Sequence, residues 1–192
     1  MPGMTESPMV FPSTKHSSGC PHPSQMNQES IEIVNMTKGD LDEIVEIEVS
    51  TFPAPWPKDV FARELEIPIS RSLVARIGGI GKSVGGYLIY WVAAGELQIH
   101  KICVGEELRR RGVGSLLMDR MIDLASREGA NLCSLEVGRS NLGARRLYEN
   151  FGFEITDIRP KYYLESGDDA MVMCADMARC LEFASRVRGR AS

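Results

Sequence analysis

The alternation of hydrophobic and polar positions predicts most elements of this chain. Residues 31–36 alternate as a β-strand does, and the apolar runs at 72–77, 84–94 and 96–104 predict three consecutive antiparallel strands. Further strands are expected at 131–137, 153–164 and 170–177, with the last two forming a closing hairpin. Apolar residues three or four positions apart predict helices over about 41–52, 58–66, 111–128 and 141–150.

The turn residues and the order of these elements predict the fold class. Prolines at 53, 55 and 57 stop the first helix at Phe52, and Gly129 stops the third. Because the third helix crosses over between the strands at 96–104 and 131–137, these two strands are expected to be parallel. The sequence therefore predicts an α/β fold with a mixed, mostly antiparallel sheet and helices on both faces.

Composition indicates a single globular domain. The chain has 192 residues, of which 43% are hydrophobic and 25% charged, and its net charge of −4 does not favour direct binding to nucleic acid. No run of 18 apolar residues predicts a membrane span, and no signal peptide is expected. The five cysteines have no paired spacing, so we expect reduced thiols and a cytoplasmic location.

The two ends differ in composition from the predicted domain at 29–177. Residues 1–28 are rich in proline and serine and are expected to be disordered. Within them His16, Cys20 and His22 match no standard zinc spacing, so no metal site is expected. Residues 178–192 carry four arginines against Glu182 and are read as a basic tail, with a frayed helix favoured over an arm that touches RNA.

The stretch 108–114, LRRRGVG, joins the strand at 96–104 to the third helix. A helix N-terminus presents unpaired N–H groups and a positive dipole end, and glycines let a ligand approach the backbone closely. The stretch therefore predicts a site for a phosphate or pyrophosphate. It is not a dinucleotide fingerprint, because Leu117 occupies the third glycine position, and it lacks the lysine of a Walker loop.

Two motifs together resemble a known family. Arg109, Gly112 and Gly114 match the pattern Q/R-x-x-G-x-G/A of the GNAT superfamily of N-acetyltransferases. The stretch 135–153 matches L-E-V-x-x-S-N-x-x-A-x-x-L-Y-x-x-x-G-F and is similar to the RimI-type branch, the ribosomal-protein alanine N-acetyltransferases. The resemblance extends over about residues 30–177 and implies the acetyltransferase fold.

The resemblance also implies a cosubstrate, acetyl-coenzyme A, and roles for particular residues. The residues that correspond to the pantetheine-binding strand are Ile102, Cys103 and Val104, and those of the pyrophosphate loop are Arg110, Arg111, Gly112, Val113, Gly114 and Ser115. Asn141 corresponds to a further coenzyme contact. Glu136 corresponds to the general base and Tyr148 to the general acid of the family.

Strand geometry and ordinary pKa values also bear on the roles of these residues. Glu136 shares a strand face with Ser134 and ends a mid-sheet strand, where open α/β sheets place ligands. An α-amine of pKa ~7.7–8.0 is partly neutral at physiological pH, whereas lysine titrates near ~10.4, so a carboxylate base favours an α-amine acceptor. Tyr148 could instead be a core tyrosine. Cys103 and Cys133 lack a nearby thiolate-stabilising partner in sequence, so direct transfer in a ternary complex is expected.

Two further stretches resemble substrate-binding elements of the same branch. Phe52 and Trp56 are similar to its F-P-W signature, with Ala54-Pro55 intervening, and Trp56 could equally be a core anchor. The segment 159–173 is similar to a tyrosine-bearing hairpin that clamps the first residues of a substrate peptide. Because Tyr162 and Tyr163 alternate across a strand, only one of them is expected to face the cleft.

The sequence thus predicts an enzyme that transfers an acetyl group from acetyl-coenzyme A to a protein N-terminal α-amine. The N-terminal alanine of a ribosomal protein is the acceptor that the resemblance suggests. A lysine side chain or a small amine remains open as the acceptor. A third interpretation is a module that binds acetyl-coenzyme A without turnover, against which the pair Glu136 and Tyr148 argues.

Overall fold

The computed structural model describes residues 30–78, 82–163 and 167–190, which form one seven-stranded sheet with helices on both faces. The strands are β1 (Ile31–Asn35), β2 (Ser70–Ile77), β3 (Ser83–Ala93), β4 (Glu96–Val104), β5 (Leu132–Gly138), β6 (Glu154–Tyr163) and β7 (Asp168–Asp176). The helices are α1 (Leu41–Thr51), α2 (Lys58–Glu64), α3 (Val113–Arg127), α4 (Leu142–Glu149) and α5 (Met177–Arg190). Short 3₁₀ turns cover Lys38–Asp40 and Glu106–Leu108.

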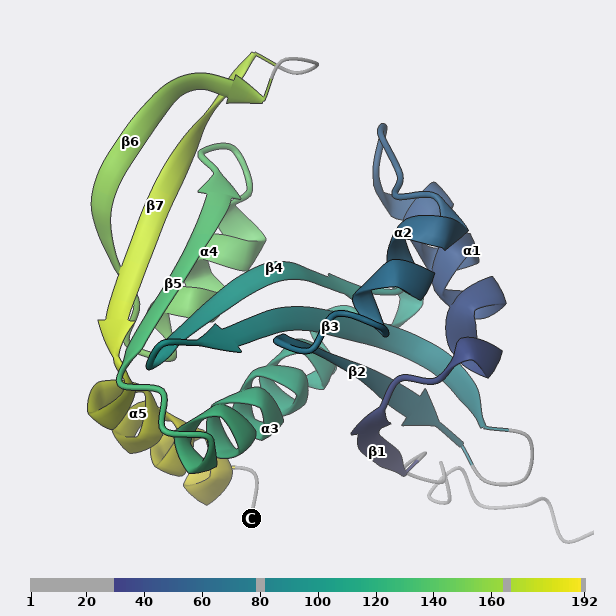
Figure 1. Ribbon diagram of the computed structural model, residues 1–192, viewed down its shortest axis with the longest axis horizontal. Coiled ribbons are helices and arrows are strands. Elements are labelled where there is room, and N and C mark those ends of the chain that lie inside the picture. Colours follow the sequence, from purple (N-terminus) through teal and green to yellow (C-terminus); the bar gives the residue numbers. More distant parts are fainter. Residues whose placement is uncertain (1–29, 79–81, 164–166, 191–192) are drawn as a thin grey trace, which may run out of the picture.

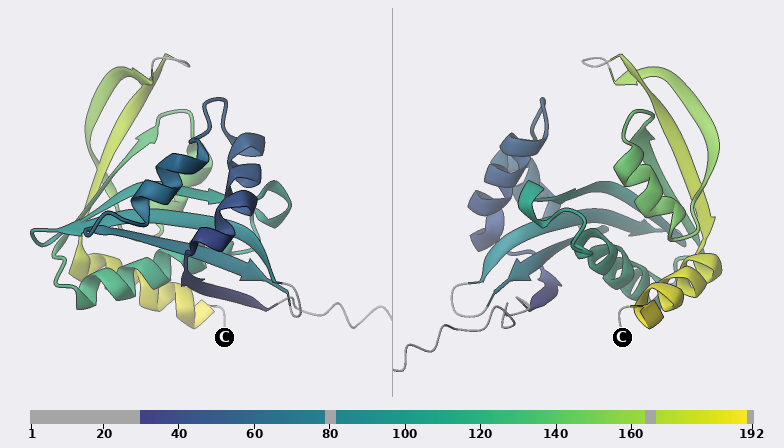
Figure 2. Two further views of the ribbon diagram at one scale, coloured as in Figure 1. Left: turned by 45° about the vertical axis from the view of Figure 1, so that its right-hand side comes forward. Right: turned by 180° about the vertical axis from the view of Figure 1, so that it is seen from behind.

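The strand order is β1-β2-β3-β4-β5-β7-β6, and every neighbouring pair is antiparallel except β4 and β5. Helices α1 and α2 cover one face, while α3 and α5 lie beneath the other (Figures 1 and 2). Two cores result: a large one under α3, α4 and α5, and a smaller one between the sheet and α1 and α2. The predicted fold class is therefore confirmed.

Local sequence explains where the first elements begin and end. The backbone N–H and the hydroxyl of Thr37 donate to Asp40 Oδ2 at 2.7 and 2.8 Å, which caps the chain before α1. The buried Asp40 carboxylate is also paired with Arg76 of β2 at 2.6 Å, so the start of α1 is tied to the sheet. Helix α1 ends at Thr51, where the prolines that follow prevent another turn.

Strands β4 and β5 separate part of the way along, and we call this opening the β4–β5 fork. Their parallel ladder contains only the pairs from Glu96↔Leu132 to Ile99↔Leu135, after which the strands diverge (Figure 1). Beyond that point β4 continues beside β3, and β5 continues beside β7. The fork leaves backbone groups of both strands without a ladder partner, so it is a place where a ligand can insert.

The C-terminal residues form part of the folded unit. The segment predicted as a basic tail, 178–192, belongs to α5 as far as Arg190. Within this helix Cys180 and Ala184 are buried in the large core against α3. Arg186 and Arg188 of this helix are exposed, with Arg186 paired to Glu182 and Arg188 to Asp119 of α3. Residues 1–28, including His16, Cys20 and His22, lie outside the described part of the chain.

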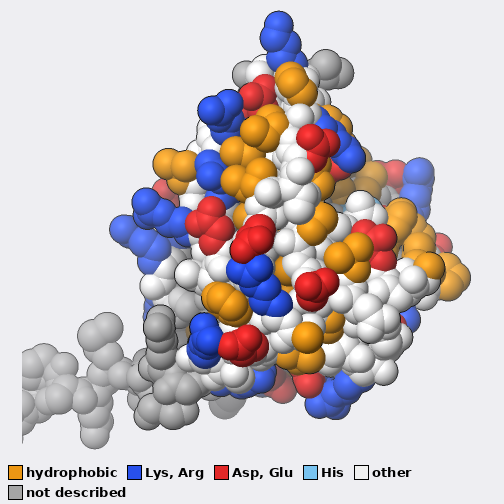
Figure 3. Space-filling view, turned by 90° about the vertical axis from the view of Figure 1, so that its left-hand side faces the viewer, with side chains coloured by type: hydrophobic (Ala, Val, Ile, Leu, Met, Phe, Trp, Pro, Cys, Tyr) orange, Lys and Arg blue, Asp and Glu red, His pale blue; other side chains and the backbone are white. Residues whose placement is uncertain are grey.

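The outer side of the β6–β7 hairpin mixes apolar and charged side chains (Figure 3). Edge strand β6 exposes Ile155 and Ile158, and its Glu154 is paired with Arg179 at 2.6 Å. Charged residues on an edge strand oppose edge-to-edge pairing with other chains. Within the described helices, no segment is both long and apolar enough to span a membrane.

Candidate active site

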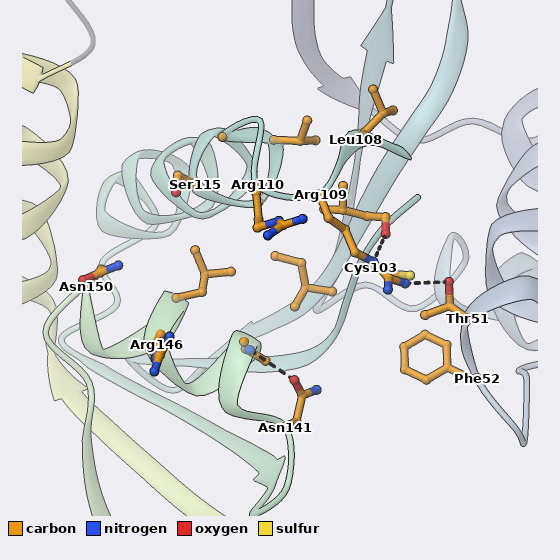
Figure 4. A pocket seen from close by; sticks show the side chains of 18 of the residues that line it. Thr51, Phe52, Cys103, Leu108, Arg109, Arg110, Ser115, Asn141, Arg146 and Asn150 are labelled. Carbon is orange, nitrogen blue, oxygen red and sulfur yellow. Dashed lines mark hydrogen bonds between the residues drawn. The ribbon is translucent and has the colours of Figure 1, made fainter. Parts of the chain in front are cut away.

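A cavity of about 780 Å³ lies between the N-terminus of α3, strand β4 and helix α4 (Figure 4). Its walls come from four segments that are distant in sequence. The lining residues are Thr51, Phe52, Ile102, Cys103, Val104, Leu108, Arg109, Arg110, Gly112, Val113, Gly114, Ser115, Ser140, Asn141, Gly143, Ala144, Arg146, Leu147 and Asn150. The cavity therefore connects the fork with the glycine turn before α3.

The glycine turn presents positive charge and backbone donors to this cavity. Gly112 precedes α3 with φ +86°, and Arg110 also has a positive φ of 61°, so the chain reverses sharply into the helix. Arg110 extends into the space between α3 and α4, and Arg146 borders it from α4 (Figure 4). Arg109 is held in place because its Nε donates to the Val104 carbonyl at 3.1 Å. This arrangement suits a pyrophosphate.

Gly114 lets α3 and α4 approach each other closely at the first turn of α3. A Cβ on this residue would lie 3.3 Å from Leu147 Cδ2 of α4, so the two helices approach closely here. Asn141 caps α4, since its side-chain oxygen accepts a hydrogen bond from Ala144 N at 3.1 Å. The N-terminal ends of both helices thus border the cavity, and the first turn of α3 presents its N–H groups there.

The end of β4 forms the wall of the cavity nearest the fork. Ile102, Cys103 and Val104 line it, and Cys103 is buried between β3 and α1. Burial raises the pKa of the Cys103 thiol, so this side chain is a poor nucleophile at neutral pH. Cys133 is likewise buried.

Nine of the ten residues expected to hold the cosubstrate line this cavity, and the exception is Arg111. The prediction missed most of the contribution of α4 and of the residues that flank it, namely Ser140, Gly143, Ala144, Arg146, Leu147 and Asn150. The available signal was Arg146, a basic residue that lies one helical turn beyond Gly143 on the same short helix.

Glu136 lies outside the cavity, at the end of β5 on the face that carries α1 and α2. Its carboxylate is paired with Arg159 of β6 and also accepts a hydrogen bond from the Tyr162 hydroxyl. That hydrogen bond raises the pKa of Tyr162, whose ring also lies 5.6 Å from the Arg159 guanidinium. The carboxylate is one-quarter exposed, so a molecule in the fork can still reach it.

Tyr148 is buried in the large core and does not line the cavity. It is 5% exposed, packs at a ring distance of 6.0 Å from Phe153, and is not among the cavity-lining residues. Burial raises the pKa of its hydroxyl, so the proton is held firmly at neutral pH. Asn141 and Tyr148, although two turns apart, therefore differ in their access to the cavity.

The four residues expected to bind the acceptor lie on both flanks of the fork. Phe52 and Trp56 follow α1, and their ring centroids are 4.3 and 4.5 Å from the Lys101 ammonium. Tyr162 is exposed and reaches Glu136, whereas Tyr163 is half-buried. Strict alternation of side chains between the two faces of a strand does not describe Tyr162 and Tyr163, because the register of β6 against β7 shifts between Arg159 and Tyr163.

Sequence reasoning also missed a buried polar cluster beside Phe52 and Trp56. The fully buried Glu48 carboxylate accepts hydrogen bonds from Tyr87, from Lys101 and, at 2.9 Å, from the backbone N–H of Trp56. The cluster fixes the loop after α1 against β3 and β4. Its signal in the sequence was an acidic residue on the apolar stripe of α1.

Comparisons with known proteins agree with this geometry. The model of the acetyltransferase (GNAT) family matches residues 41–153. A Bacillus subtilis protein provisionally named a ribosomal protein bS18-alanine N-acetyltransferase is 37% identical over 140 residues, which are 72% of this chain and 91% of that protein. The N-alpha-acetyltransferase RimI of Mycobacterium tuberculosis is 32% identical over 151 residues, covering 77% of this chain and 94% of the relative.

Solved structures give the same result for the fold. The crystal structure of the ribosomal-protein-S18-alanine N-acetyltransferase from Escherichia coli superposes with a TM-score of 0.69 and 27% identity. That match covers 77% of this chain and 94% of the other. With its glycine turn, forked strands and cavity, this chain belongs to the GNAT family and is an N-acetyltransferase that uses acetyl-coenzyme A as its cosubstrate.

Proposed function

We propose that this enzyme acetylates the N-terminal α-amine of a protein, and that a ribosomal protein with an N-terminal alanine is the acceptor. One observation carries the proposal: the identity of 37% extends over 91% of a relative with that named activity. The Escherichia coli enzyme named for the same reaction is 30% identical over 94% of its length. A ribosomal-protein acceptor would place the reaction in the cytoplasm.

The acceptor side of the fork supports an α-amine rather than a lysine. The two aromatic rings that could line a passage for an alkylammonium, Phe52 and Trp56, already enclose the ammonium of Lys101. In addition, an α-amine near pKa ~7.7–8.0 needs less help to lose its proton than a lysine near ~10.4. Tyr162 and Tyr163 on the hairpin are then available to contact the first residues of the acceptor chain.

The roles of the chain's own residues follow from their positions. Arg110, Arg146 and the N-terminus of α3 would hold the pyrophosphate, and the end of β4 would hold the pantetheine arm. Glu136 is proposed to promote the loss of the amine proton, and Tyr148 is the proposed donor of a proton to the departing thiolate. The raised pKa of the Cys103 thiol opposes an acyl-cysteine intermediate, so transfer is direct.

The proposal is tested by following thiol release from acetyl-coenzyme A with two matched sets of peptides. One set begins with a free Ala, Ser or Met, and the other is blocked at its N-terminus and carries one internal lysine. We expect release only with the free N-termini. Release with the blocked lysine set would change the acceptor class, and binding of acetyl-coenzyme A with no release on either set would indicate a module without turnover.

A further inference from the structure

Strand β4 carries a bulge at the point where it leaves β5. Its register against β3 passes from Tyr90↔Ile99 to Ile89↔Lys101, so His100 is the extra residue. A bulge redirects the side chains around it, and here both bulged residues contact groups on the α1–α2 face. His100 packs on Trp91 of β3, and Lys101 reaches Glu48 of α1. The bulge therefore places two basic residues on the face of the sheet that carries α1 and α2, directly before Ile102 and Cys103.

His100 lies opposite Glu136 across the fork. The last parallel pair is Ile99↔Leu135, and His100 and Glu136 are the next residue on each strand. The imidazole is stacked on Trp91 with ring centroids 4.1 Å apart, which fixes its plane. His100 Nε2 is shielded from solvent and has no hydrogen-bond partner among the residues that the structure describes. An unsatisfied nitrogen in such a place calls for a partner from outside the chain.

The charged groups around His100 come from three elements. Glu64 of α2 accepts hydrogen bonds from Trp91 Nε1 at 2.9 Å and Ser70 Oγ at 2.6 Å, and Glu136 approaches from β5. The neighbouring cation on β4, Lys101, is engaged by Glu48. Burial lowers the pKa of His100 and outweighs the opposing effect of Glu64 and Glu136. The imidazole is therefore neutral, and able to accept a proton, at physiological pH.

We propose that His100 is a further catalytic residue, which takes the proton that the acceptor amine loses while Glu136 stabilises the resulting imidazolium. This inference rests on the proposed function and deepens it. A neutral imidazole can accept the proton of the amine through its unpartnered Nε2. The carboxylate of Glu136 is moreover already engaged by Arg159 and Tyr162.

Acetyl transfer by this route balances in protons and in electron pairs. The lone pair of the amine nitrogen forms the new C–N bond, and the C–S bond breaks with its electron pair passing to sulfur. The amine proton goes to His100, and the proposed acid Tyr148 gives a proton to the thiolate. The imidazolium then releases its proton to solvent, and the tyrosine recovers one from solvent, so the enzyme returns to its starting state.

The inference is tested with the variant His100→Phe, which retains an aromatic ring to pack on Trp91. We expect kcat to fall by ~10²-fold or more, the size typical of a lost general base, with an unchanged KM for acetyl-coenzyme A. The fall of kcat at acid pH, which protonation of the imidazole causes in the wild type, should disappear. Because residues that act as a unit are not additive, His100→Phe with Glu136→Gln should be little worse than either single variant. A kcat and pH profile equal to wild type would overturn the proposal.

A second measurement does not depend on turnover or on the folding of the His100 variant. The His100 imidazole is titrated by NMR in the wild-type chain and in Glu136→Gln. We expect a pKa below the usual ~6.5 that falls further without the Glu136 carboxylate, because an anion nearby favours the imidazolium. An unchanged pKa in Glu136→Gln would overturn the pairing across the fork. If the titration shifts but the wild type acetylates no peptide, the proposed function fails and takes the catalytic role of His100 with it.

Discussion

At the scale of single residues, Glu136 and the cosubstrate cavity occupy separate places. Because Glu136 is not part of the cavity wall, its loss should affect the chemical step and spare the binding of acetyl-coenzyme A. We expect Glu136→Gln to lower kcat by ~10²–10⁴-fold and to leave the KM for acetyl-coenzyme A unchanged. Steady-state thiol release with a peptide that has a free N-terminus measures both values.

The matched control for this variant is Glu154→Gln. Glu154 also forms an ion pair with an arginine, but on the outer side of β6, away from the fork. Its substitution should leave both parameters as in the wild type. Equal losses in the two variants would mean that the effect of Glu136 is one of stability, and a rise in KM for acetyl-coenzyme A alone would place Glu136 in cosubstrate binding.

The buried pair of Glu48 and Lys101 gives a prediction about stability. Lys101→Met leaves the fully buried Glu48 carboxylate without its cation, so we expect a loss of about 3–5 kcal/mol in the free energy of unfolding. Adding Glu48→Gln should recover much of that loss, because no buried charge is then left unpaired. Urea unfolding of the two single variants and the double variant supplies the comparison.

An exposed ion pair serves as the reference for that cycle. Lys38 and Glu66 are paired at 3.0 Å with both side chains largely in solvent, so Lys38→Met should change stability by less than about 1 kcal/mol. A Lys101→Met protein as stable as the wild type would show that the cluster does not depend on its cation.

At the scale of elements, the glycine turns at the two ends of α3 should have equal effects on stability but different effects on cosubstrate binding. Gly112 has φ +86° at the start of α3, and Gly129 has φ +84° just beyond its end. Alanine at either position should cost ~1–2 kcal/mol, because neither has an atom near its added Cβ and both bear the left-handed backbone penalty. Only Gly112→Ala should also raise the KM for acetyl-coenzyme A, since only that turn borders the cavity. Equal KM values in both variants would contradict the assignment of the anion site.

Helix α5 offers a test of whether the C-terminal segment is structural. Ala184 is fully buried in the large core, and its neighbour Ser185 is exposed. Ala184→Glu should lower the melting temperature strongly, because it buries an unpaired charge, whereas Ser185→Glu should leave it near the wild-type value. Thermal unfolding followed by circular dichroism distinguishes the two. An equal, small effect of both would mean that α5 is a detachable tail.

Local sequence signals predicted the elements and most of the residues that line the cavity, but not the arrangement on the acceptor side. Periodicity predicted the strands and helices, and the glycine turn with its arginines predicted an anion site at a place where the structure has a cavity, because both signals are local. The bulges at His100 and between Arg159 and Tyr163 depend on which residue of the neighbouring strand is paired, which alternation within one strand does not show. For that reason the position of His100 opposite Glu136 and the ion pair between Arg159 and Glu136 could not be predicted from the sequence.

At the scale of the whole molecule, the divergence of β4 and β5 connects the two halves of the site. The cavity runs from the turn into α3 and from α4 to Phe52 and Cys103, and Glu136 and His100 lie on the face that carries α1 and α2. A thioester bound along the end of β4 would be reached by the acceptor from the opposite face of the sheet. This geometry matches direct transfer between two substrates held at the same time.

The most direct test of the central claim is to identify where the acetyl group goes. One peptide that carries both a free N-terminal alanine and an internal lysine is incubated with the enzyme and acetyl-coenzyme A, and the product is fragmented in a mass spectrometer. We expect the acetyl group on the α-amine, with the lysine unmodified and the product greatly reduced in Glu136→Gln. Acetylation of the lysine in preference to the N-terminus would contradict the account.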